Sequence, residues 1–116
     1  METETIVLLI DSSEADRKDV RSILGDRVDR YVEAASPAEA WTLVKEEAHI
    51  SMMIAGLAPD QGEDIFDLRD HLMERTGPFP SVYCSRDDMT PFYPRVLETE
   101  RLFFKPVNRG ILLEWF

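Results

Sequence analysis

The stretch that decides the fold is "IVLLI" (residues 6–10), which runs directly into Asp11. Five apolar residues without a break suit a strand that is buried on both faces, as strands of a parallel sheet are. The following residues, "DSSEADRKDVRSILG" (11–25), instead place their apolar side chains on one helical face. Ser13, with Asp16 three residues later, predicts the N-cap of this helix. A buried strand that leads into an amphipathic helix is the first half of a βα unit.

This alternation of apolar run and helical pattern occurs five times along the chain. Further strands are predicted at 30–35, 50–55, 80–85 and 101–104, and further helices after Ser36-Pro37, from Ile65 to near Gly77, over 91–98, and after Asn108. Alternating strands and helices imply parallel strands, right-handed crossovers and helices on both faces of the sheet. In such open sheets the functional side chains lie at the carboxyl ends of the strands.

Composition narrows the class of protein. The 116 residues suit one domain, and a formal net charge of −10 opposes contact with phosphate backbones, so we expect no nucleic-acid partner. Cys84 is the only cysteine, which excludes an internal disulfide and fits a reducing cytoplasm. The polar start "METET" predicts no signal peptide, and no apolar run approaches the roughly 20 residues of a membrane span. We therefore expect a cytoplasmic domain with no membrane partner.

The predicted strand ends carry a characteristic set of residues, namely Asp11 and Ser12, Ala35, Ala55, Ser85 and Lys105. Arg17 lies six residues after Asp11, Pro59 lies four after Ala55, and Pro106 follows Lys105. In this order and spacing, nearly the whole chain resembles the receiver domain of bacterial response regulators. The resemblance implies a flavodoxin-like (βα)5 fold, an α/β/α three-layer sandwich around a five-stranded parallel sheet of order 2-1-3-4-5.

The resemblance also implies a chemistry for which this sequence lacks the residues. In a typical receiver domain, an Asp at the end of the third strand takes a phosphoryl group from a kinase phosphohistidine. That Asp and acids after the first strand hold Mg²⁺, while a lysine and a hydroxyl group contact the phosphate. By alignment the acceptor position here is Ala55, and Ser12 replaces the second acid. Asp11 alone is at most a weak metal ligand, so we expect no Mg²⁺, no other cofactor and no enzymatic activity.

We therefore predict a pseudo-receiver with a degenerate, non-phosphorylatable pocket. Its residues are Asp11, Ser12, Ala55, Ser85, Arg86 and Lys105. A salt bridge between Asp11 and Lys105 is predicted, and the Arg86 guanidinium is placed to fill the space of the phosphate. The alternative is a receiver that a histidine kinase phosphorylates at Asp60, Asp64 or Asp11. A third hypothesis is an enzyme or cofactor binder on a flavodoxin-like fold, although the loops lack the polar phosphate cradle that a flavin needs.

The segment "TPFYPRVL" (90–97) has more apolar side chains than the packing of one short helix needs. In the resembled family, the face of the fourth helix, fifth strand and fifth helix is the usual docking and dimerisation surface, so a protein partner or a second copy is expected there. The candidate interface residues are Phe92, Tyr93, Val96, Leu102 and Trp115. Because the sequence stops inside an amphipathic helix, we expect a receiver-like domain over 1–116 that precedes a covalently linked output domain in a two-component-type signalling protein.

Overall fold

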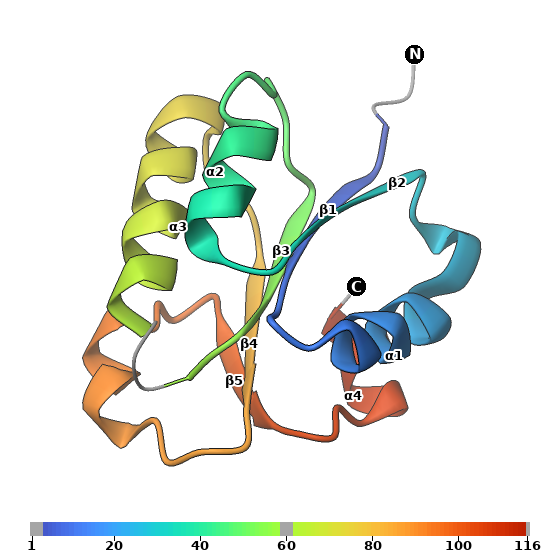
Figure 1. The fold of residues 1–116 in the computed structure, drawn as a ribbon, viewed down its shortest axis with the longest axis vertical. Coiled ribbons are helices and arrows are strands. Elements are labelled where there is room, and N and C mark those ends of the chain that lie inside the picture. Colours follow the sequence, from blue (N-terminus) through green and yellow to red (C-terminus); the bar gives the residue numbers. More distant parts are fainter. Residues whose placement is uncertain (1–3, 59–61, 116) are drawn as a thin grey trace.

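The computed structural model describes residues 4–58 and 62–115, which form a five-stranded parallel sheet between two helical layers (Figure 1). The strands are β1 (Ile6–Ile10), β2 (Arg30–Ala34), β3 (Met52–Gly56), β4 (Ser81–Ser85) and β5 (Arg101–Phe104). The helices are α1 (Glu14–Leu24), α2 (Pro37–Val44), α3 (Gly62–Thr76) and α4 (Arg109–Trp115), with 3-10 helices η1 (Gly25–Arg27) and η2 (Thr90–Arg95). The sheet order β2-β1-β3-β4-β5 confirms the predicted fold class.

Each face of the sheet has its own apolar core. Leu8 and Ile10 of β1 face the layer of α2 and α3, whereas Val7 and Leu9 face α1 and α4 (Figure 1). Because helices cover both faces, every residue of β1 is buried, as its unbroken apolar run predicts. The strands run parallel, so their carboxyl ends meet at one edge of the sheet.

Local capping positions three of the helices that flank this edge. The Ser13 hydroxyl accepts a hydrogen bond from the backbone N–H of Asp16 at 3.2 Å, and Ser36 caps α2 in the same way through Glu39. Asn108 caps α4 by accepting from the N–H of Ile111 at 3.0 Å. These contacts confirm the predicted starts of α1, α2 and α4.

The segment predicted as a helix over 91–98 is instead the 3-10 helix η2. Phe92 donates its N–H to the carbonyl of Met89, and Val96 donates to Tyr93, both with the tighter spacing of a 3-10 turn. The physical reason is Pro94, which has no N–H to donate one α-helical turn back. Among the described residues, no helix has the length and apolar character that crossing a bilayer requires.

Candidate functional site

Two carboxylates and one ammonium group meet at the carboxyl edge of the sheet. Lys105, which follows β5, places its Nζ 2.7 Å from Oδ2 of Asp11 and 2.9 Å from Oδ2 of Asp16. The three side chains are only 10 to 14% exposed, so water screens these ion pairs weakly. Burial alone would lower the pKa of Lys105, but the two carboxylates outweigh it and raise that pKa. The predicted pair of Asp11 and Lys105 is therefore present.

The sequence reading missed Asp16 as a member of this site. Arg86 donates two hydrogen bonds to its carboxylate, at 2.7 and 3.0 Å, and Lys105 donates a third. The bonds from Arg86 lower the pKa of Asp16 well below its ordinary value, with Lys105 adding to the effect and burial opposing it. The sequence assigns Asp16 to a capping box with Ser13, but the N–H of Ser13 donates to Oδ1 of Asp11 instead. That bond frees the Asp16 side chain to face Lys105.

The register of β3 puts Gly56, rather than Ala55, beside Asp11. Ala55 pairs with Ile10, and both side chains lie in the core under α2 and α3. Gly56 faces the opposite way, and a β-carbon there would lie 2.2 Å from Oδ2 of Asp11. The side chain of Ala55 thus lies on the face of Tyr83 and Ser85 and not beside Asp11, while the assignment of position 55 as the acceptor position stays a prediction. Successive residues of a strand point to opposite faces, so a shift of one residue moves the side chain to the other side of the sheet.

The remaining predicted pocket residues are brought together at the same edge. Ser85 is buried, and its hydroxyl donates to the carbonyl of Leu57 at 2.9 Å while it accepts from the N–H of Asp87 at 3.0 Å. Ser12 is exposed and, with Arg86, borders a hollow beside Lys105. The hydroxyl that would contact a phosphate in the resembled family is therefore already used in holding two loops together.

The residues of this edge do not fit a Mg²⁺ ion. Octahedral Mg²⁺ needs several oxygen ligands around one point. Here the point between the Asp11 and Asp16 carboxylates is occupied by the Lys105 ammonium, and Gly56 supplies no side-chain oxygen. No group of three or more acidic, histidine or cysteine side chains among the described residues is arranged to hold a metal ion.

Comparison with solved structures supports the fold. The chain matches a response regulator receiver protein from Sinorhizobium medicae with a TM-score of 0.81 at 20% identity, over 97% of this chain and 90% of that one. A signal receiver domain of a two-component histidine kinase from Clostridium thermocellum gives 0.80 at 18% identity, over 97% and 94% of the two chains. A receiver protein from Pseudomonas putida gives 0.78 at 24% identity, over 99% and 97%. No family model and no curated protein matches the sequence. The chain thus has the fold of receiver domains.

A second polar cluster lies buried beneath η2, and sequence patterns gave no sign of it. Arg69 of α3 donates to Oε1 of Glu100 at 2.8 Å and to the carbonyl of Arg95 at 2.7 Å. Tyr83 of β4 donates to Oε2 of Glu100 at 2.8 Å, and Leu97 donates its N–H to Oε1 at 2.9 Å. The side chains of Arg69 and Glu100 are 4% and 0% exposed. This cluster fastens the η2 segment to α3 and β4.

Most of the predicted interface side chains turn inward. Phe92, Val96 and Leu102 pack against the core under α3, whereas Tyr93 is 49% exposed. The side chain of Trp115 lies outside the described residues.

Two further apolar side chains are exposed near the β5 edge. They are Leu97, at 43%, and Phe104, at 67% on the edge strand β5. The strand alternation along "RLFF" (101–104) could have predicted that Phe104 is exposed. Phe103 packs toward α4, so the next side chain faces away from that layer.

Of the two alternative phosphoacceptors that the structure describes, Asp11 and Asp64, one lies at Lys105. Asp60 lies outside the described residues. Asp64 is exposed on α3 and borders a groove against α2, not the hollow that Lys105 lines. Asp11 is the only one of the three that contacts the lysine in the described structure, and it does so as an ion-pair partner.

Proposed function

We infer that this chain is a pseudo-receiver, a domain with the receiver fold that works by binding another protein and accepts no phosphoryl group. The observation that carries this proposal is the state of Lys105. Its ammonium group is shared by Asp11 and Asp16, while β3 presents only Gly56 on the same face. A nucleophilic oxygen, a metal and a free cation for the phosphate are all required for acyl phosphate formation. At this pocket β3 offers no carboxylate, the carboxylates of Asp11 and Asp16 are already paired, and the Lys105 ammonium is engaged by both of them.

The direct test uses a small phosphoryl donor. The chain is incubated with Mg²⁺ and acetyl phosphate and its intact mass is measured, while a ¹⁵N-labelled sample is titrated with beryllofluoride. We expect no added phosphoryl mass and no shift changes around Lys105. A hydroxylamine-labile adduct would overturn the proposal, and mapping it to Asp11, Asp60 or Asp64 would establish the alternative in which a histidine kinase phosphorylates this domain.

A pair of variants tests the register on which the proposal is built. Ala55→Asp places a carboxylate in the apolar core under α3, where an unpaired charge is not tolerated, so we expect an unfolded chain. Gly56→Asp places the carboxylate on the pocket face, where Asp11 must give way and the two compete for Lys105, so we expect a chain that is destabilised but folded. Circular dichroism separates these outcomes. If Ala55→Asp is folded and Gly56→Asp is not, the assigned register is wrong.

The interaction face that we propose is the β5 edge with the η2 segment. Tyr93, Leu97 and Phe104 expose large apolar surfaces there, and β5 is bonded to a neighbour on one side only. Such unpaired edges and exposed aromatics are favourable contact surfaces. A second copy of the chain is the occupant we propose, because a twofold axis would set one such face against its equivalent.

Sedimentation velocity over a range of concentrations tests this face. We expect a concentration-dependent dimer that Phe104→Ser and Leu97→Ser weaken. Leu43→Ser is the matched control, because Leu43, 49% exposed against 43% for Leu97, lies on α2. A chain that is monomeric at all concentrations, or that Leu43→Ser weakens as much as Phe104→Ser does, contradicts this assignment.

A further inference from the structure

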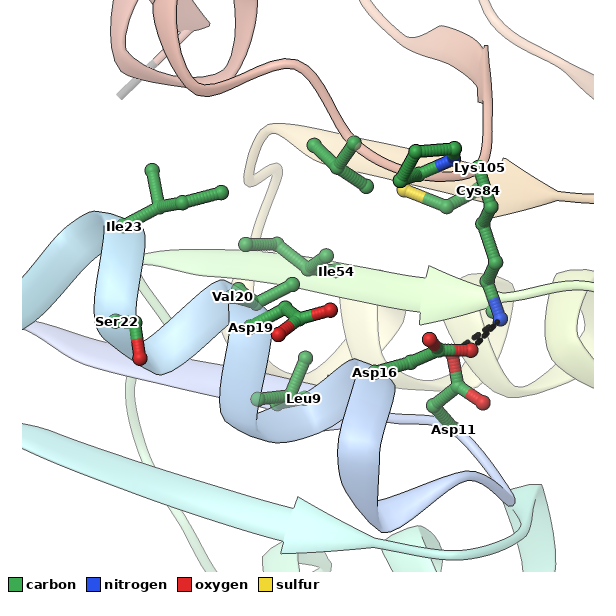
Figure 2. Close-up of a pocket in the computed structure, with 13 residues that line it drawn as sticks. Leu9, Asp11, Asp16, Asp19, Val20, Ser22, Ile23, Ile54, Cys84 and Lys105 are labelled. Atoms are coloured by element: carbon green, nitrogen blue, oxygen red, sulfur yellow. Dashed lines mark hydrogen bonds and ion pairs between the residues drawn. The ribbon is translucent and has the colours of Figure 1, made fainter.

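A mainly apolar cavity lies between α1 and the segment that follows β5. Its volume is about 270 Å³. The sheet supplies the floor through Leu9, Ile54 and Cys84, and α1 supplies one wall through Val20 and Ile23 (Figure 2). Pro106 and Val107 close the opposite side. The cavity is slightly smaller than the usual ligand pocket, so it suits a single ring or a short branched chain.

Gly56 keeps the end of the cavity near Lys105 open. It lines the cavity without a side chain, and any larger residue would enter the space that Asp11 now fills. Asp11, Asp16 and Lys105 lie together at this end, Asp19 and Ser22 lie farther along α1, and most of the remaining lining is apolar (Figure 2). A ligand that fits this arrangement has an apolar body and one polar head group.

The charged side chains that line the cavity determine whether a cationic or an anionic head group fits. Three carboxylates, those of Asp11, Asp16 and Asp19, line the cavity together with one ammonium, that of Lys105. Lys105 is engaged by Asp11 and Asp16, and Arg86 pairs with Asp16 from outside the cavity, whereas no hydrogen bond or ion pair of the exposed Asp19 is found within the described residues. Asp19 lies one turn after Asp16 on α1, and Figure 2 shows its carboxylate directed toward the cavity. An anionic ligand is repelled by this surplus of negative charge, and a cation is attracted.

We propose that this cavity binds small organic cations, with an ammonium head group on Asp19 and an aromatic or branched aliphatic body against Leu9, Val20 and Ile54. This activity goes beyond the proposed role in protein binding and does not require it. It provides a non-covalent input at the edge of the sheet where typical receivers take a phosphoryl group. Occupancy would contact Val107, which connects β5 to α4.

The experiment titrates the ¹⁵N-labelled chain with 2-phenylethylamine, and with 2-phenylethanol and phenylacetate as neutral and anionic probes of similar shape. We expect shift changes confined to amides at the cavity lining, around residues 9–11, 16–23, 54–56, 84 and 105–107. We expect the amine to bind at least about 10-fold more tightly than either other probe. Asp19→Asn is expected to remove this preference. Asp26→Asn, an exposed acid on η1 away from the cavity, is the matched control and is expected to leave it intact.

A second variant keeps the test independent of charge. Ile23→Trp enlarges the half-buried side chain on the α1 wall and is expected to block all three probes, with folding checked by the dispersion of the spectrum. The proposal is overturned if none of the probes binds at about 5 mM, a concentration at which even weak ligands of this size are detected. It is also overturned if phenylacetate binds as well as the amine, or if Asp19→Asn and Asp26→Asn behave alike.

Discussion

Glu100→Gln removes one charge from the buried cluster under η2 and changes almost nothing in shape. Glu100 accepts three hydrogen bonds, from Arg69, Tyr83 and the N–H of Leu97. A glutamine oxygen can keep the bonds from Arg69 and Leu97, but its NH₂ group then points at Tyr83, whose O–H loses its acceptor. A buried donor left without a partner costs about 1–3 kcal/mol. The Arg69 guanidinium, 4% exposed, keeps only the half-exposed Asp70 as a counter-charge.

Together these losses predict a destabilisation of about 3 kcal/mol, at the lower end of the range for breaking a buried ion pair. Urea unfolding followed by circular dichroism measures it. With an m-value of about 2 kcal/mol per molar, the midpoint moves down by about 1.5 M. Glu98→Gln is the matched control, because Glu98 is exposed, and it is expected to change stability by less than about 0.5 kcal/mol.

A double variant identifies the buried charge of Arg69 as the cause. In an Arg69→Met background no guanidinium is left unpaired, so Glu100→Gln is expected to cost at least about 1.5 kcal/mol less than in the natural chain. The reasoning is refuted if Glu100→Gln costs less than about 1 kcal/mol, or if its cost is the same in both backgrounds. Either result would mean that solvent reaches the cluster or that η2 is not fastened by it.

Three further outcomes follow from the pocket edge of the sheet. Gly56→Ala is expected to destabilise the fold by about 1–3 kcal/mol, because the added β-carbon would overlap the Asp11 carboxylate. Gly110→Ala in α4 is the control in the same urea assay. Its β-carbon meets nothing closer than 3.4 Å, so we expect unchanged or increased stability. The pKa of Asp16 is lowered from 3.8 in the folded chain, so as the pH falls the unfolded chain protonates this carboxylate first. The free energy of unfolding is therefore expected to fall as the pH drops below about 4. Asp16→Asn is expected to reduce this pH dependence in unfolding curves measured from about pH 5 to about pH 2. Burial raises the pKa of the Cys84 thiol to about 12, so little reactive thiolate is present at pH 8. Alkylation by iodoacetamide, followed by mass spectrometry, is expected to be at least about 100-fold slower in the native chain than in urea. Equal rates would contradict the burial of Cys84.

The topology could be predicted from the sequence because each of its signals is local. The apolar run 6–10, the caps Ser13 and Ser36, and the regular alternation of strand and helix each depend on neighbouring residues alone. Parallel pairing and the handedness of crossovers then leave few arrangements. The same holds for Asn108, whose cap appears where it is predicted.

The sequence could not assign the side chains of β3 to the two faces of the sheet, for a physical reason. "MMIA" (52–55) is buried on both faces, so it has no alternation of polar and apolar residues that would assign each side chain to a face. The pairing with β1 assigns the faces directly: Ile10 lies opposite Ala55, so Gly56 falls beside Asp11. The bond between Arg69 and Glu100 joins residues 31 apart, and no local pattern encodes such a contact.

The lack of a nucleophile at the end of β3 holds in either register, because neither Ala55 nor Gly56 has a side-chain oxygen. What the register changes is the reason that the pocket is closed to phosphate. A methyl group on the pocket face would overlap the place of the Asp11 carboxylate. With Gly56 there, Asp11 fits beside the strand and, with Asp16, holds the lysine. Restoring an acceptor therefore requires more than one substitution, since a carboxylate at position 56 must first displace two that are already paired.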